Sequence, residues 1–399
     1  MATISPAPFV RLKAHNEDDT VKTEREILGA AGKARRDPGR PLIIVVAALC
    51  VVGLVMVMSA SSVDAMRNYG SSWHFFTRQA IAVILGAIAL FVTARVDYHF
   101  WRKFVVPGLL GVMFLLFLVL IPGIGQTAYG ARRWLGAGPL QFQPSELAKL
   151  ALILFSADIL ARHPPSREGP TPLYVVGGAT FFITILVMAQ PDMGTTLVIV
   201  GSVLAVLVLG GTPWRLLFTG FMTTAVFGAL VALIEPYRRE RLLSFTDPFE
   251  SASGSGYQVV QSLVGLGSGG IRGVGLGASR AKWGFLPNAH TDFIFAIIGE
   301  ELGLFGAIGV VGLFVALAVY GIRAATRAPD AYGALVAGGI TAWLVGQGAL
   351  NMATVVGALP VTGVPLPFVS LGGTSTLFCM AAAGVLVNIA RQRPVAESR

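Results

Sequence analysis

Asp292 is the residue best placed to do chemistry. It ends a polar stretch that begins near Gly284, and a long apolar run follows it. An ionisable group at membrane depth is costly and therefore points to function, although capping of the following helix competes with this interpretation. His290 and Thr291 beside it could hydrogen-bond a substrate. With no partner acid in the pattern, Asp292 suits general-base work better than paired-carboxylate hydrolysis.

Two arginines and a buried-looking lysine form a second group. Arg132 and Arg133 stand beside Trp134, which is typical of an interfacial anchor. Glu146 and Lys149 follow Pro144 at a helical i,i+3 spacing and could simply pair. Guanidinium forks and a lysine point charge also match phosphate oxygens. At the outer membrane surface, this group would suit a lipid-linked pyrophosphate.

The remaining polar residues carry weaker signals. Asp192, in a tight turn, is expected to cap the next helix slightly more readily than to bind substrate. Glu300 and Glu301 cannot pair with Asp292 on a helix, and structural bracing is at least as good an interpretation. The glycines between 254 and 277 follow no strand, so close backbone packing or phosphate cradling is expected instead of a dinucleotide site. The five histidines form no metal-binding motif.

Composition places these residues in a membrane protein. Hydrophobic residues make up 54% of the chain and charged residues 13%, and the 48 glycines suit closely packed membrane helices. The net charge of +9 is interpreted as cytoplasmic loop charge and not as nucleic-acid binding. Cys50 and Cys379 lie in apolar stretches and are expected to be free thiols.

The hydropathy pattern predicts an all-α integral membrane protein with about ten transmembrane helices. The large extracytoplasmic loop lies between helices 7 and 8. Predicted cytoplasmic segments carry 19 Lys and Arg and outer segments 10, which puts both termini in the cytoplasm. The ten spans are 41–60, 79–97, 104–121, 147–162, 173–189, 194–209, 214–234, 294–322, 332–356 and 374–390.

The chain divides into one membrane domain and two tails. Residues 1–40 are polar and carry eight bases, so we expect a disordered cytoplasmic tail. Residues 41–391 form the polytopic domain, and 392–399 a short cytoplasmic tail. The two long outer segments, 122–146 and 235–293, are rich in glycine and aromatic residues. We expect them to form short interfacial helices and re-entrant pieces over a groove.

Several motifs in order resemble those of the SEDS family (shape, elongation, division and sporulation), the bacterial enzymes FtsW, RodA and SpoVE. The resemblance covers nearly everything after the tail. The matching pieces are 130–134, 142–149, 190–195, 256–262, 269–277, 286–295, 300–303 and 359–374. Asn288 departs from the pattern, because many members have Glu there.

The resemblance implies a peptidoglycan glycosyltransferase that uses lipid II. Asp292 would deprotonate the 4-hydroxyl of the acceptor sugar as it attacks the anomeric carbon of the growing chain, with release of undecaprenyl pyrophosphate. A divalent cation, Mg²⁺ or Mn²⁺, is a candidate cofactor without an evident cage in the sequence. The candidate lipid II-binding residues are Arg132, Arg133, Lys149, Glu146, His290, Thr291, Lys282 and Gln258.

Within the family, three stretches favour the division branch, with septal synthesis at the bacterial plasma membrane: 58–62, 73–79 and 298–303. The stretch 360–363 occurs in both branches and is often RodA-like, so an elongation polymerase is the alternative. A lipid II flippase and a scaffold are the other classes. The implied partners are an FtsI-like class B penicillin-binding protein, divisome proteins and membrane lipids, but no nucleic acid.

Overall fold

Helices provide almost all of the regular structure. The computed structural model describes residues 37–128, 131–136, 141–165, 170–220, 222, 248–249, 254 and 256–392. A short antiparallel hairpin joins β1 (Gln126–Ala128) to β2 (Ala131–Trp134). The helices are α2 (Arg40–Tyr69), α3 (His74–Thr93), η1 (Tyr98–Phe104), α4 (Val105–Leu120), α5 (Pro144–Arg162), α7 (Thr171–Met188), α8 (Met193–Leu209), α11 (Tyr257–Gly269), η3 (Ala281–Trp283), α12 (Ile294–Thr326), α13 (Ala331–Val355) and α14 (Gly373–Arg391).

The predicted helical membrane fold is confirmed. Among the described residues, seven helices are long and apolar enough to cross a membrane: α2, α3, η1 with α4, α7, α12, α13 and α14. α8 is shorter, and α5 carries buried charged residues along its length. Nine of the ten predicted spans coincide with a helix. The predicted span 214–234 lies mostly outside the described residues, as do the tails 1–40 and 392–399.

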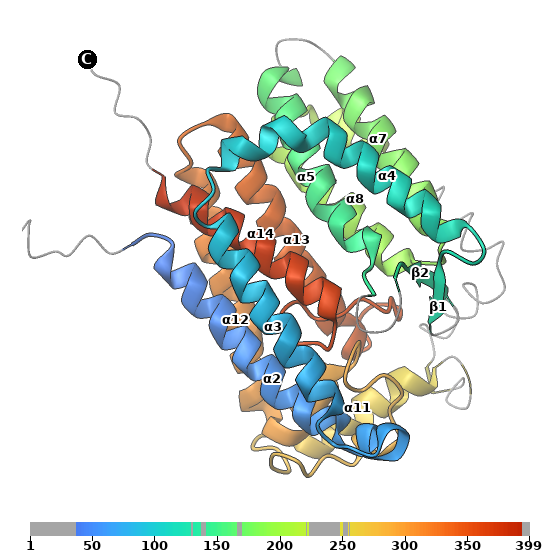
Figure 1. The fold of residues 1–399 in the computed structure, drawn as a ribbon. Coiled ribbons are helices and arrows are strands. Elements are labelled where there is room, and N and C mark those ends of the chain that lie inside the picture. Colours follow the sequence, from blue (N-terminus) through green and yellow to red (C-terminus); the bar gives the residue numbers. More distant parts are fainter. Residues whose placement is uncertain are drawn as a thin grey trace, which may run out of the picture. The chain divides into compact units, whose positions relative to one another are not determined.

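Figure 1 shows the course of the described helices. Their buried apolar side chains form two hydrophobic clusters. The larger cluster joins α2, α3, α12, α13 and α14, and the smaller joins α4, α5, α7 and α8. α5 contributes Ile153 to the first cluster and Leu152 to the second, because neighbouring residues point about 100° apart on a helix. Gly384 lets α14 approach α3 closely, since a Cβ at this position would collide with Thr93 of α3.

The first long outer segment differs from its prediction. We expected short interfacial helices in 122–146, but in its described part residues 126–128 and 131–134 form two antiparallel strands, which pair Gln126 with Trp134. Neither stretch is long enough for a stable helix, whereas strand pairing satisfies their backbone N–H and C=O groups. In the second segment, α11 and η3 confirm short helices, and much of 223–255 lies outside the described residues.

α12 is broken at Gly303, whose backbone has φ of 67° and ψ of −162°. The loop after α11 packs into this break, where Val274 N donates to Glu300 O at 3.0 Å and Gly275 N to Glu301 O at 3.0 Å. A side chain at Gly273 would collide with the Glu301 carbonyl. Close backbone packing, one of the two sequence interpretations, therefore accounts for this part of the glycine-rich stretch.

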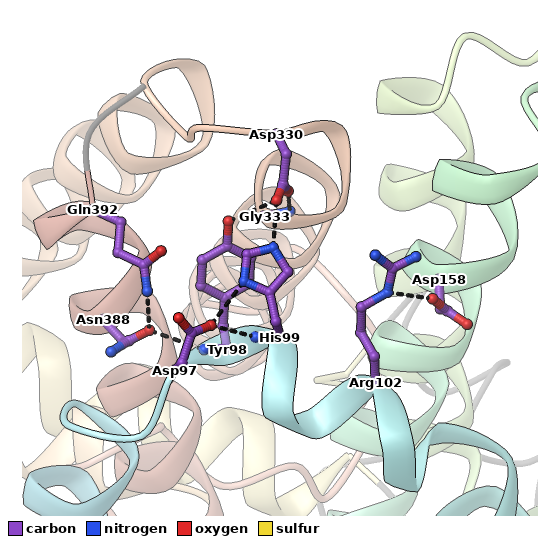
Figure 2. A network of polar contacts seen from close by, with 9 residues as sticks. All are labelled: Asp97, Tyr98, His99, Arg102, Asp158, Asp330, Gly333, Asn388 and Gln392. Carbon is purple, nitrogen blue, oxygen red and sulfur yellow. Dashed lines mark hydrogen bonds and ion pairs between the residues drawn. The ribbon is translucent and has the colours of Figure 1, made fainter. Parts of the chain in front are cut away.

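A polar network ties together the helix ends at the side predicted to be cytoplasmic. Figure 2 shows the His99 ring between two carboxylates, with Nδ1 at 2.7 Å from Asp97 and Nε2 at 2.6 Å from Asp330. Tyr98 donates its hydroxyl to Asp330 at 2.9 Å and its backbone N–H to Asn388 of α14 at 3.1 Å. The network fixes the α3–α4 connection against α13 and α14.

Candidate functional site

A buried ion pair stands in the first turns of α5. Lys149 Nζ lies 2.8 Å from Glu146, and both side chains are almost fully buried. The ammonium also donates to Gln347 Oε1 of α13 at 2.8 Å and lies 5.1 Å from the centre of the Trp343 ring. Gln347 in turn donates to the Pro365 carbonyl at 2.9 Å. The pair is thus linked to the α13–α14 connection.

Asp292 lies in a tight turn before α12. Asn288 has a left-handed backbone with φ of 57°, and its carbonyl accepts hydrogen bonds from the N–H groups of Thr291 and Phe293. α12 begins at Ile294, and Phe293, not Asp292, occupies the N-cap position. Asp292 therefore stands one residue before the N-cap position of α12, and its half-buried carboxylate belongs to the preceding turn.

The turn is held against the α13–α14 connection. Asn351 of α13 donates its amide to the Asp292 carbonyl at 2.7 Å and to the Val364 carbonyl at 2.8 Å. A Cβ built on Gly363 would lie 3.6 Å from Asp292 Oδ2. Because Gly363 has φ of 69° and carries no side chain, the backbone passes close to the carboxylate without covering it.

Arg133 and Asp192 form the third part of the site. Arg133 Nε donates to the Gln190 carbonyl at 3.1 Å, and its Nη1 lies 3.6 Å from Asp192. Asp192 accepts from the Thr195 N–H at 3.1 Å at the start of α8, so the predicted cap is present. Gln143 donates to the other Asp192 oxygen at 3.2 Å. β2, α5 and α8 therefore meet at one buried carboxylate.

Arg132 points elsewhere, because successive residues of a strand face opposite sides. Its Nη1 donates to the Leu120 carbonyl at the end of α4, 3.2 Å away. Its Nε is buried and has no hydrogen-bond partner among the described residues. The two arginines are therefore not equivalent, since Arg133 braces the turn at Gln190 and Arg132 retains donor capacity.

The connection 362–365 brings these parts together. A Cβ at Gly194 would collide with Thr362 and Val364, so the Asp192 turn lies directly on this connection. Gly363 faces Asp292, and Pro365 accepts the hydrogen bond from Gln347. This short segment thus lies next to three parts of the site that are far apart in the sequence. They are Asp292, the Glu146–Lys149 pair and the Arg133–Asp192 pair.

Lys282 is held apart from this group. Its ammonium donates to the Gly277 carbonyl and lies 3.5 Å from Glu301. Glu301 also accepts from Ser59 of α2 at 2.7 Å, and Glu300 accepts from the Arg280 N–H at 2.8 Å. The bracing interpretation of the two glutamates fits this arrangement. Lys282 is a member of that brace, and its predicted substrate role stays a prediction.

The remaining candidates do not join the three groups either. The His290 ring stacks on Phe75 of α3, with centroids 4.8 Å apart, and burial lowers the pKa of His290 although nearby Asp64 opposes this. Thr291 donates its hydroxyl to the Asn288 carbonyl. Gln258 lies in the first turn of α11, and no hydrogen bond links it to the other candidates in the described residues.

Sequence reasoning missed the residues of α13 that connect the site. Gln347 and Asn351 are four residues apart in an apolar span, and both are buried. That spacing places two polar groups on one face of the helix, which is a signal for function or bracing in a membrane. Gln143, the partner of Asp192, was not a candidate either.

The residues present do not form a metal cage. No group of three or more His, Cys, Asp or Glu that could hold a metal ion occurs in the described ranges. The three carboxylates of the site stand apart, and Glu146 and Asp192 each face a cation. The predicted Mg²⁺ or Mn²⁺ stays a prediction, and no step below passes through it.

Comparison with known proteins identifies the family. Residues 40–394 match the family model for FtsW, RodA and SpoVE, described as "Cell cycle protein". The chain belongs to the SEDS family. It is 41% identical to stage V sporulation protein E of Bacillus subtilis over 362 residues, which cover 90% of this chain and 98% of that protein. It is 39% identical to the probable peptidoglycan glycosyltransferase FtsW of Geobacter metallireducens over 353 residues, 87% and 93% of the two chains.

Solved structures of SEDS proteins share the fold. A chain in a peptidoglycan synthase complex superposes with a TM-score of 0.72 at 31% identity, covering 88% of this chain and 97% of its own. The rod-shape-determining protein RodA of Thermus thermophilus gives a TM-score of 0.66 at 29% identity, covering 88% and 96%. The predicted SEDS resemblance is confirmed, while these identities leave the division and elongation branches unresolved.

Proposed function

We propose that this protein polymerises lipid II during septal cell-wall synthesis, with Asp292 as the general base. The enzyme class follows from the family: the chain is a SEDS peptidoglycan glycosyltransferase. The observation that carries the proposed site is the convergence of Asp292, the Glu146–Lys149 pair and the Arg133–Asp192 pair on residues 362–365. A base and two fixed cations are what transfer from a sugar pyrophosphate requires.

In the proposed reaction, Asp292 accepts the proton of the acceptor 4-hydroxyl. The hydroxyl oxygen attacks the anomeric carbon of the growing chain, and the bond from that carbon to the pyrophosphate oxygen breaks with inversion. The electron pair leaves with undecaprenyl pyrophosphate. A general base of this kind contributes about 10²–10⁴-fold to a rate, and the half-buried position of Asp292 in its turn suits it to that role.

The cations of the site would stabilise the leaving group. Lys149 and Arg133 are each positioned by a carboxylate, so their location is fixed before substrate binds. Arg132 uses Nη1 for the Leu120 carbonyl, whereas Arg133 donates to the Gln190 and Pro191 carbonyls and faces Asp192, so more terminal N–H groups remain for phosphate on Arg132. We therefore assign direct contact with the pyrophosphate to Arg132, whereas Arg133 mainly orders the turn at Gln190 and adds positive charge near the leaving group.

The septal role and the partner are further parts of the proposal. The stretches 58–62, 73–79 and 298–303 support the division branch, and the similarity to a chain from a peptidoglycan synthase complex supports an FtsI-like class B penicillin-binding protein as partner. The position of the site residues argues against a flippase. They lie at or near the N-terminal ends of α5, α8 and α12, whereas a flippase would place its polar groups near the bilayer midplane.

The test is reconstitution in liposomes, with fluorescent lipid II in both leaflets to follow polymerisation and, in a parallel sample, in one leaflet only to follow transbilayer movement. The expected result is glycan strands, with undecaprenyl pyrophosphate released in equal amount to the new linkages, and more of both when the class B partner is present. Transbilayer movement of lipid II without glycan product would instead make the protein a flippase. Septal enrichment of a tagged chain in dividing cells, against uniform sidewall signal, decides between division and elongation.

A further inference from the structure

A polar pocket lies beside the turn that carries Asp292, and Asp292 itself is not among the residues that line it. It has a volume of about 430 Å³ and is formed by the C-terminal end of α2, Phe75 near the start of α3, and the loop 282–290. The catalytic role proposed for Asp292 makes no use of it. A pocket of this size, with a few polar groups among apolar walls, has the dimensions of a small-molecule site.

The polar lining comes mainly from the last turns of α2. Asp64 accepts from Asn68 at 2.8 Å through Oδ1, and its Oδ2 has no hydrogen-bond donor in the described residues. Arg67 donates through Nη1 to the Trp283 carbonyl at 3.3 Å, which leaves further guanidinium N–H groups at the pocket. Lys282 also lines the pocket, but its ammonium is engaged by Glu301, 3.5 Å away, and by the Gly277 carbonyl. The Asp64 carboxylate, the Asn68 amide and the Arg67 guanidinium thus offer both acceptors and donors, with opposite charges on Asp64 and Arg67.

The apolar lining is aromatic. The Tyr69 and Phe75 rings meet edge to face with centroids 5.4 Å apart, and Phe75 stacks on His290. Burial lowers the pKa of His290, so its imidazole is neutral at physiological pH and can both donate and accept. Tyr69 is half exposed at the pocket. Phe75 is 7% exposed and its ring is covered by His290, so the aromatic surface open to the pocket is that of Tyr69, one face of which stacks on His74.

This combination selects one ligand chemistry. A phosphate would meet the Asp64 carboxylate, and an acyl chain would desolvate Asp64 and Arg67 without replacing their hydrogen bonds. A saccharide ring has hydroxyl and acetamido groups for the acceptors and donors, and its apolar face packs on aromatic rings. His290 and Asp292 are two residues apart, so their Cα atoms are separated by at most about 7 Å.

We infer that this pocket, defined by Asp64, Arg67, Asn68, Tyr69, Phe75 and His290, is a saccharide subsite that holds an amino-sugar unit of the glycan strand next to the unit that reacts at Asp292. The inference rests on the proposed function for the identity of the saccharide. It assigns the end of α2 and the loop 282–290 to saccharide binding, and Asp292, two residues beyond His290, to chemistry.

The test measures binding of a lipid-free tetrasaccharide of alternating N-acetylglucosamine and N-acetylmuramic acid to the purified full-length protein in nanodiscs. Asp64→Ala and Asn68→Ala each remove a hydrogen-bonding group and are expected to weaken binding about tenfold. Arg78→Gln, on the exposed face of α3 outside the pocket, is the matched control and is expected to bind normally. Asp292→Asn is also expected to bind the tetrasaccharide. Thermal unfolding verifies that each variant is folded.

Polymerisation provides the second readout. Asp64→Ala is expected to initiate strands and to release them shorter than wild type does. The subsite is overturned if wild type does not bind the tetrasaccharide, or if folded Asp64→Ala and Asn68→Ala bind it with the affinity of wild type. Pocket-dependent saccharide binding by a protein that makes no glycan from lipid II would support the subsite and reject the proposed polymerase function, so the two failures are distinct.

Discussion

The buried Glu146–Lys149 pair gives the sharpest stability prediction. The two groups lie 2.8 Å apart with side chains that are 2% and 0% exposed. Lys149→Met removes the cation at nearly constant volume and leaves the carboxylate buried without its partner. Breaking a buried pair in this way typically costs about 3–5 kcal/mol. Glu146→Gln together with Lys149→Met removes both charges, and replacement of a whole pair is often close to neutral.

Gln347 determines how much unfolding free energy the double variant still loses. It accepts from Lys149 and from Trp343 through the same oxygen, so one donor survives the substitution. A residual loss of about 1 kcal/mol is therefore expected for the double variant, about 2–4 kcal/mol less than the loss for Lys149→Met alone, so the two single losses should not be additive. The measurement is reversible unfolding in mixed detergent micelles, followed by tryptophan fluorescence.

The matched control is Arg162→Met on the same helix. Arg162 is 53% exposed, and its partner Asp158 keeps a second ion pair with Arg102 at 2.7 Å. Its loss should cost less than about 1 kcal/mol. If Lys149→Met costs no more than this control, or if the two single substitutions at the buried pair are additive, the account of a mutually dependent pair is wrong. Even when it is folded, the double variant should polymerise lipid II more slowly than wild type, because it lacks the Lys149 cation proposed to stabilise the leaving group.

Three further predictions concern positions around the site and the helix ends. His290→Phe keeps the stacking on Phe75 but removes the titrating group. The unfolding free energy of wild type should be highest above pH 6.5, the ordinary pKa of histidine, and should fall as pH drops through the lowered folded-state pKa of His290. This pH dependence should be absent in the unfolding of the variant. Asp330→Ala removes the α13 cap and the contact to His99, so the free energy of unfolding should fall by about 1–2 kcal/mol. Arg133→Gln should lower the unfolding temperature and Arg132→Gln chiefly the affinity for lipid II; equal effects on both readouts would contradict their separate roles.

Helix positions were predictable because apolar length alone determines them. The run before residue 322 gives α12, and the run 374–390 gives α14, to within a few residues. The Asp192 cap was also predictable from its place before an apolar run. The break at Gly303 was not, since it depends on a loop more than 25 residues upstream that packs against Glu300 and Glu301.

The candidate residues were identified better than their arrangement. Spacing suggested the pairing of Glu146 with Lys149, which the structure shows. It could not show that residues 362–365 lie between Asp192 and Asp292, because that contact joins segments more than 70 residues apart. Nor could neighbouring positions reveal that Arg132 and Arg133 face different partners, which follows from the strand that carries them.

The most direct test of the proposed mechanism is the polymerisation rate of Asp292→Asn. The variant, reconstituted with its class B partner and lipid II, should bind lipid II with unchanged affinity, because asparagine keeps the shape of the side chain. Its rate should fall by about 10²–10⁴-fold through loss of the base. Polymerisation within threefold of wild type by folded Asp292→Asn would contradict the assignment of Asp292 as the catalytic base.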